Sequence, residues 1–408
     1  MFTYLFQSGR YISFFGIAVI LGVAFLFSRH KNKVNIRLVI SALIMQFILA
    51  FCILRTAIGR DLFAALSAGF SKLYQFSGAG GRFVFGGLAD VTGPWGPLFF
   101  VTVVPIIIFF GALMALLYHF GIVQMAVRGV SFLIRPILGT TGAETLCAAS
   151  NSMLGQTEAP LLIRKYLDSM TESEILLVMI SGMATMNGAL LAVYGSMGVP
   201  MLHLLSASIM SIPGAILISK ILLPETKKID GDGSIVMERD TKNALDAISK
   251  GTSDGMHLAV NVVAMLIAFI SLIAFINYVL GGITQYAFGA RYTLDTFFSK
   301  IFSWVAVLIG VPFQDKSAAG ALLGQKLVIN EFVAYANFVK MELTPRAKTI
   351  LTYALCGFSN FSCIGIQIGG IGALAPKKRH VLIKLGMTAV LGGTLANFLN
   401  AAIAGLFV

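Results

Sequence analysis

The chain has 408 residues, of which 57% are hydrophobic and only 12% are charged. Charged residues make up about 25% of an ordinary soluble domain, so this composition excludes that class and predicts a polytopic membrane protein. The net charge of +12 comes largely from lysines and arginines in short loops between apolar spans. Basic residues in such loops set membrane topology and contact lipid headgroups. We therefore expect membrane lipid as a partner and no nucleic acid.

Eight apolar stretches are long enough to cross a bilayer. In chain order they cover residues 11–28, 38–57, 98–118, 175–194, 199–223, 256–280, 350–375 and 381–408. Dense basic clusters follow the first and seventh stretches and occur in the long loop between the fifth and sixth. The positive-inside rule places these clusters in the cytoplasm and both termini outside.

Two further regions predict interfacial helices. Residues 119–138 place apolar side chains at helical spacing, with Arg128 and Arg135 off that face, which is typical of a helix along the membrane surface. Residues 61–97 are mixed and rich in glycine, so we expect an interfacial helix followed by a loop, with a close-packing or breaking segment at 80–87. The connection 281–300 is polar, and 301–311 is a short apolar piece.

The sequence N-S-M-L-G-Q-T-E-A-P at 151–160 interrupts a long apolar region. Gly155 and Pro160 do not sit easily inside a helix, so the chain is expected to turn between them. Gln156, Thr157 and Glu158 add hydrogen-bonding groups and a carboxylate at membrane depth, where an ionisable residue indicates a functional site. We interpret this stretch as the tip of a re-entrant hairpin that holds a substrate.

A second interrupted region at 312–340 repeats the spacing of the first. Each region carries a glutamate, followed after 13 residues by a threonine near a helix start and after 16 more by an asparagine that breaks a span. The two sets are Glu158, Thr171 and Asn187, then Glu331, Thr344 and Asn360. Because the two units enter the membrane from opposite sides, they are inverted repeats. Many secondary transporters form a midplane site from such repeats.

The two tips and two broken spans would enclose a cavity. Irregular backbone at membrane depth is tolerated only where it is buried in protein or lines a water-filled cavity, because its polar groups need hydrogen-bond partners. Its polar groups would be Gln156, Thr157, Glu158, Asn187, Glu331, Asn360 and Ser362. These donors and acceptors suit hydroxyls and a heterocycle edge. The set has no obvious cationic clamp, which favours a neutral polyol or nucleoside-like solute over a nucleotide.

Structural roles are the alternatives for these residues. The glutamates would then pair with Lys165 or Lys326, and the amides and Thr157 would join helices. Asn360 would cap a half-helix, and Cys363, three residues further on the same helix face, would serve as a small packing residue.

Three motifs resemble the concentrative nucleoside transporter family. They are Gly155-Gln156-Thr157-Glu158-Ala159-Pro160, Asn330-Glu331-Phe332-Val333-Ala334-Tyr335 and Cys356-Gly357-Phe358-Ser359-Asn360-Phe361-Ser362. Their order and spacing agree with that family over roughly residues 80 to 408. The resemblance implies a bacterial homotrimer in the inner (plasma) membrane. It also implies symport of a nucleoside such as uridine with sodium or protons, by movement of a transport domain against a trimer scaffold.

The resemblance also implies roles for individual residues. Gln156, Thr157 and Glu158 would face the nucleobase with Leu190 packed against it, and Glu331 and Asn360 would bind ribose. The family usually has serine at the position of Cys363, and neighbouring Ser362 would compensate for the weaker thiol donor. The sodium ligands would be Asn151, Leu154, Thr157, Thr185 and Met186, some of them through backbone carbonyls.

An asparagine at the Asn151 position accompanies sodium coupling in the family, which makes a sodium-coupled symporter our first expectation. Two alternatives stay open at this point: proton coupling, with Glu158 or Glu331 as the titrating group, and a helix-capping role for Asn151. An enzyme is disfavoured because no Ser/His pairing stands out, and a channel because inverted hairpins suit alternating access better.

The predicted fold is an all-α polytopic membrane protein with eight transmembrane helices, two re-entrant hairpins in inverted repeats, and interfacial helices. Residues 1–138 would be mostly scaffold, 139–223 the first hairpin repeat of the transport domain, and 224–254 a cytoplasmic loop. Residues 255–311 would return to the scaffold, and 312–408 would form the second hairpin repeat of the transport domain.

Overall fold

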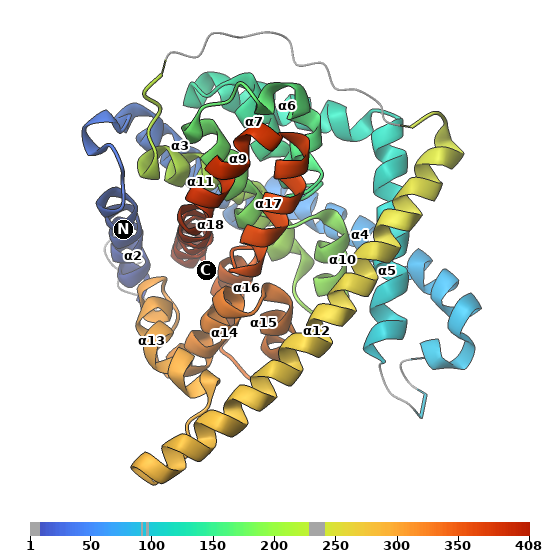
Figure 1. Cartoon of the computed structure of the whole chain (residues 1–408), viewed down its shortest axis with the longest axis vertical. Coiled ribbons are helices and arrows are strands. Elements are labelled where there is room, and N and C mark those ends of the chain that lie inside the picture. The colour runs from blue at the N-terminus through green and yellow to red at the C-terminus, as the bar shows by residue number, and fades with distance from the viewer. Residues whose placement is uncertain (1–8, 91–92, 95–97, 228–240) are drawn as a thin grey trace.

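The computed structural model describes residues 9–90, 93–94, 98–227 and 241–408, and Figure 1 shows the whole chain. These described ranges are helical and contain no strand. Part of the expected cytoplasmic loop, residues 228–240, lies outside them. The main helices are α2 (Arg10–Leu26), α3 (Ile36–Arg55), α4 (Ala57–Phe85), α5 (Phe99–His119), α6 (Ile122–Leu138), α7 (Gly142–Asn151), α8 (Arg164–Leu167), α9 (Glu172–Ala184), α10 (Gly188–Ser196), α11 (Met201–Leu222), α12 (Ala244–Phe288), α13 (Leu294–Leu308), α14 (Lys316–Val328), α15 (Glu331–Phe338), α16 (Pro345–Leu355), α17 (Ser362–Leu374) and α18 (Arg379–Phe407).

The eight predicted crossings each coincide with a helix or a broken helix. Six apolar segments of the described chain are long enough to cross a membrane, namely α3, α5, α9 with α10, α11, α12, and α18 together with the short turn before it. Apolar α2 and the broken pair α16 and α17 supply the other two. The prediction of an all-α polytopic membrane protein is therefore confirmed, as is the amphipathic helix at α6.

The broken helix α9/α10 lies at the centre of the protein and α12 at its edge. In the most apolar stretch of each, 94% of the α9/α10 residues are buried in the protein, against 6% for α12. Figure 1 shows α12 running along one side of the molecule, beside α5. Glycines permit that close packing, because a Cβ at Gly111 of α5 would lie 2.6 Å from the carbonyl oxygen of Gly251 in α12. Polar groups on α9 and α10 therefore face protein, whereas most of α12 is left exposed.

The segment 80–87 both packs closely and ends a helix, as the sequence indicated. Helix α4 continues to Phe85 and ends at Gly86 with φ 56°. Gly81 lets α4 approach α5, because a Cβ there would lie 3.2 Å from Pro105. The expected end of the sixth span was wrong, since helix α12 continues through Gly281 to Phe288, where the sequence indicated a polar connection. A glycine inside a helix costs only about 1 kcal/mol, which a long hydrogen-bonded helix tolerates.

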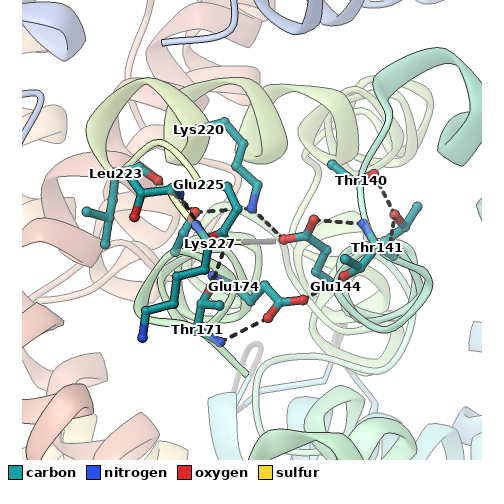
Figure 2. Close-up of polar contacts among 12 residues, drawn as sticks. Thr140, Thr141, Glu144, Thr171, Glu174, Lys220, Leu223, Glu225 and Lys227 are labelled. Carbon is teal, nitrogen blue, oxygen red and sulfur yellow. Dashed lines mark hydrogen bonds and ion pairs between the residues drawn. The ribbon is translucent and has the colours of Figure 1, made fainter. Parts of the chain in front are cut away.

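A buried polar cluster joins the starts of α7 and α9 to the end of α11, as Figure 2 shows. Thr141 and Thr171 begin α7 and α9 with capping boxes, in which Glu144 and Glu174 accept hydrogen bonds from the threonine amides, both at 2.9 Å. The Thr141 hydroxyl donates to Glu174 at 2.8 Å, and Lys220 of α11 lies 2.6 Å from Glu144. Three helix ends of the first hairpin repeat are thus held in one arrangement.

Lys220→Met is expected to lower stability by about 3 kcal/mol, because removing one partner leaves the Glu144 carboxylate buried without its ammonium. The matched control is Lys384→Met, whose partner Glu172 is half-exposed and lies at 2.8 Å. Exposed pairs contribute about 1 kcal/mol or less. Thermal unfolding of both detergent-solubilised variants measures the difference. Equal shifts in the two unfolding midpoints would contradict a structural role for the buried pair.

Candidate substrate-binding site

Both interrupted regions fold as helical hairpins whose tips turn inside the protein. In the first, α7 ends at Asn151, the chain turns at Gly155 with φ 100°, and a 3₁₀ helix returns over Ala159–Ile163. In the second, α14 and α15 are separated only by Ile329 and Asn330, and the Asn330 side chain caps α15. The turn expected between Gly155 and Pro160 is therefore present.

The two broken helices restart at the asparagines that the repeat singled out. The Asn187 side chain accepts a hydrogen bond from the Leu190 amide at 2.9 Å and so caps α10. The Asn360 side chain accepts one from the Cys363 amide at 3.1 Å at the start of α17. A Cβ on Gly155 would lie 2.9 Å from that of Asn187, so the first tip touches the first break directly.

A cavity of about 690 Å³ lies between these elements and the helices α5 and α12. Its polar side is formed by the hairpin tips and breaks, and Phe110, Met114, Asp254 and His257 line it from α5 and α12. All seven residues predicted to bind substrate line this one cavity, namely Gln156, Thr157, Glu158, Leu190, Glu331, Asn360 and Cys363. The structure thus brings the whole predicted set together, although it comes from four separate segments.

Glu331 is held by hydrogen bonds from two other helices. The Tyr194 hydroxyl of α10 donates to one carboxylate oxygen at 3.2 Å, and the Asn360 amide donates to the other at 3.1 Å. The Ser362 hydroxyl in turn donates to the Asn360 side-chain oxygen at 2.7 Å. A carboxylate fixed in this way keeps further lone pairs for the hydroxyls of a ligand. The alternative Glu331–Lys326 ion pair is not observed within 4.0 Å in the described residues.

Gln156 and Cys363 meet at the other end of the polar wall. The Gln156 amide donates to the Cys363 sulfur at 3.3 Å, and its oxygen accepts from the Gln367 amide at 3.1 Å. Gln367 also donates to the Met179 carbonyl oxygen at 3.0 Å and is fully buried. Sequence reasoning missed Gln367 and Tyr194. A signal was available for Gln367, a polar residue four positions after Cys363 in an apolar span.

Two of the five expected cation ligands, Asn151 and Thr185, contact Ser181 of α9. The Asn151 amide donates to the Ser181 hydroxyl at 2.9 Å, and the Thr185 hydroxyl donates to the Ser181 carbonyl oxygen at 2.8 Å. Asn151 is the last residue of α7, so the alternative that it caps a helix start is wrong. Asn151, Thr185 and Met186 are fully shielded from solvent and Leu154 is buried, whereas the Thr157 side chain is exposed at the cavity wall.

The Asn151 side-chain oxygen is buried and has no hydrogen-bond partner among the described residues. A buried acceptor without a donor is costly, which points to a ligand that meets it. A hard cation such as Na⁺ fits, because hydroxyl, amide and carbonyl oxygens are its preferred ligands. Sequence reasoning did not name Ser181, the residue that connects Asn151 to Thr185.

Comparisons with known proteins agree on one family. The family model described as Na⁺ dependent nucleoside transporter C-terminus matches residues 203–405, its N-terminus counterpart matches 15–88, and a nucleoside recognition model matches 100–201. A Helicobacter pylori nucleoside permease is 38% identical over 96% of both chains. An uncharacterized transporter of Haemophilus influenzae is 42% identical over 97% of both chains.

Solved structures give the same result. The chain is similar to CNTnw in an inward-facing substrate-bound state, with a TM-score of 0.93 and 40% identity over 97% of each chain. A doubly substituted CNTnw in an outward-facing state matches with a TM-score of 0.92 and 39% identity over 98% of this chain and 97% of that one. The family and the apolar helices make the chain a multi-pass protein of the bacterial inner membrane and a transporter rather than an enzyme. The chain belongs to the concentrative nucleoside transporter family and transports nucleosides.

Proposed function

We propose that the protein is a sodium-coupled symporter that imports nucleosides such as uridine. The observation that supports sodium as the coupling ion is the buried side-chain oxygen of Asn151, which has no partner among the described residues and lies beside Ser181 and Thr185. The family models are described as Na⁺ dependent. The rat sodium/nucleoside cotransporter 1 is 36% identical over 97% of this chain, which spans 63% of that longer protein.

In the proposed site, the nucleobase faces the first hairpin and the ribose faces the second. Gln156, Thr157 and Glu158 offer donors and acceptors for the base edge, and Leu190 packs against the ring. The ribose hydroxyls donate to Glu331 and bond Asn360, with Cys363 beside them. This assignment is supported because all seven side chains line one cavity and Glu331 is already oriented by Tyr194 and Asn360. The cation ligands proposed are Asn151, Leu154, Thr157, Thr185 and Met186.

The proposed mechanism is an elevator in a homotrimer. Residues 139–223 and 312–408 would move together as the transport domain, while 1–138 and 255–311 form the scaffold and 224–254 connect them. The cavity supports this division, because hairpin residues form one wall and α5 and α12 the other. Similarity to both inward-facing and outward-facing structures is consistent with one fold serving two states.

Uptake of radiolabelled uridine into proteoliposomes tests the proposal, with sodium and proton gradients imposed separately. An inward sodium gradient at equal pH should drive accumulation, and a proton gradient in sodium-free buffer should not. The second candidate is proton coupling, which the position of Glu158 at the cavity wall favours. Accumulation driven by the proton gradient alone would select that candidate.

Cys363→Ser is expected to keep or improve uridine affinity, because a hydroxyl is a stronger hydrogen-bond donor and acceptor than a thiol. In the protein that retains Cys363, a thiol reagent should block uptake and uridine should slow the block. Cys52 is exposed, so the assay uses a Cys52→Ser background. Modification at a rate that uridine does not change would show that the Cys363 sulfur does not face the ribose.

A further inference from the structure

The two repeats keep the same register in the structure as in the sequence. An offset of 173 residues relates Glu158 to Glu331 and Asn187 to Asn360. The two asparagines make the same contact, since each side-chain oxygen accepts a hydrogen bond from the backbone amide three residues later, that of Leu190 in α10 and that of Cys363 in α17. Positions at this offset are therefore structural counterparts. A difference in charge between counterparts therefore marks a position where the two halves of the site differ in their electrostatics.

Lys326 is such a difference. It lies in the last turn of α14 with only 2% of its surface exposed, and it has no carboxylate within 4.0 Å among the described residues. Its ammonium donates to the Ala354 carbonyl oxygen and to the Asn397 side-chain oxygen, both at 2.7 Å. A buried charge at membrane depth is costly and indicates function.

The Lys326 ammonium contacts the counterpart of a residue that holds two of the proposed cation ligands. Ala354, whose carbonyl it contacts, is the counterpart of Ser181, which contacts both Asn151 and Thr185. The counterpart of Lys326 at this offset is Met153, two residues after Asn151, and both Asn151 and Lys326 lie in the last turn of the first helix of a hairpin. The oxygens in the first repeat are neutral, and the second repeat carries a positive charge at this point.

Both places lie at the carboxyl end of a half-helix, where the helix dipole favours a cation. The end of α16 is satisfied by donors from the protein. These are the Tyr335 hydroxyl to Thr352 O at 2.8 Å, Lys326 to Ala354 O at 2.7 Å, and the Asn397 amide to Cys356 O at 2.7 Å. The end of α9 also has protein donors, the Asn397 amide to Ala184 O at 2.8 Å and the Gln367 amide to Met179 O at 3.0 Å, but the neighbouring Asn151 side-chain oxygen of α7 has no partner among the described residues.

Asn397 of α18 connects the two breaks. Its amide donates to the Ala184 carbonyl oxygen at the end of α9 and to that of Cys356 at the end of α16. Its oxygen accepts from Lys326 and, at 3.1 Å, from the Ser359 hydroxyl. The Lys326 ammonium therefore fixes a side chain that also holds the break where the first repeat would bind its ion.

We propose that Lys326 is the tethered cation of the second repeat, occupying at the α16/α17 break the place that a co-transported cation takes at the α9/α10 break. It is a positioning residue. Through Ala354 and Asn397 it orders the break from which Asn360 reaches Glu331. The second hairpin repeat then reaches its ordered arrangement without binding an ion from solution, and only the first repeat requires such an ion. The role of that ion rests on the proposed sodium coupling.

The test uses the full-length protein with three substitutions at this position. Lys326→Ala removes the charge and leaves space, Lys326→Met removes the charge and fills the space, and Lys326→Gln removes the charge but keeps a donor. Lys340→Ala, at an exposed lysine after the same hairpin, is the matched control. Uridine affinity and thermal stability are measured in methylammonium chloride, whose cation resembles the end of the lysine side chain. Choline chloride at the same ionic strength is the control salt.

Lys326→Ala is expected to weaken uridine binding at least about tenfold, since bonds from a charged donor are lost. Methylammonium, but not choline, should restore most of that loss and raise the unfolding midpoint of this variant, with no effect on Lys326→Met or Lys340→Ala. Should the alanine variant fold only with methylammonium present, that result supports the proposal equally. Alanine and methionine variants that respond alike to methylammonium would contradict it.

Lys326→Gln decides the question if the alanine variant does not fold. A glutamine variant that binds uridine within twofold of the unsubstituted protein overturns the proposal, because hydrogen bonding then suffices without charge. Loss of binding in a folded glutamine variant supports it. An unsubstituted protein that does not bind uridine would instead contradict the proposed substrate, and the effect of methylammonium on stability would remain a test of the tethered cation.

Discussion

Glu331→Gln is expected to weaken uridine binding by roughly 100-fold while leaving the protein folded. The carboxylate accepts from Tyr194 and Asn360 at 3.2 and 3.1 Å and faces the cavity. Hydrogen bonds to a charged group contribute about 1.5–3 kcal/mol each, and 1.4 kcal/mol corresponds to tenfold in affinity. Glutamine keeps the shape but replaces one acceptor oxygen with an NH2 donor, so the groups that donate to Glu331, namely Tyr194, Asn360 and the ribose hydroxyls, can no longer all be accepted.

The measurement compares uridine with 2′,3′-dideoxyuridine, which has the same base and lacks the two hydroxyls. The unsubstituted protein should prefer uridine strongly, and Glu331→Gln should bind both equally weakly. Glu342→Gln, an exposed carboxylate after the same hairpin, is the matched control and should keep the preference. A Glu331→Gln protein that still distinguishes the two nucleosides would remove Glu331 from the ribose site.

The chemistry of the cavity was accessible from sequence because polar residues at membrane depth are conspicuous. Gln156 and Glu158 interrupt an apolar region. The distance along the chain from Glu158 to Asn187 equals that from Glu331 to Asn360, and this repeat predicted both hairpins and both breaks. Those breaks are present, at the ends of α9 and α16. The spacing was informative since each half-helix needs a cap where the chain restarts.

The contacts between spans were not accessible in the same way. Tyr194 looks like any aromatic residue of an apolar helix, yet its hydroxyl bonds Glu331 at 3.2 Å. Asn397 is one amide in the last span, and only the fold shows that it reaches the ends of both α9 and α16. Glycine was ambiguous as well: Gly81 marks close packing against α5, whereas Gly86 ends its helix with a positive φ. Composition does not distinguish these two uses.

Sodium is expected to raise uridine affinity at fixed pH, and Asn151→Ser is expected to reduce that effect about tenfold or more. The buried Asn151 oxygen has no partner among the described residues, so a cation held there would satisfy it. The same side chain bonds Ser181, and the first tip touches the break at Asn187. An ion at this point therefore orders the wall that faces the nucleobase. Coupling energies between sites typically correspond to 5–150-fold changes in affinity.

Linkage supplies the decisive check on this prediction. Uridine must raise sodium affinity by the same factor by which sodium raises uridine affinity, and Asn151→Ser must reduce both factors equally. The control is Asn35→Ser, at an asparagine that caps α3 outside the cavity, where serine is an equally good cap. That variant should retain full coupling. If sodium leaves uridine affinity unchanged while lowering the pH raises it, the ion at this site is not sodium, and a proton carried by Glu158 or Glu331 becomes the coupling species.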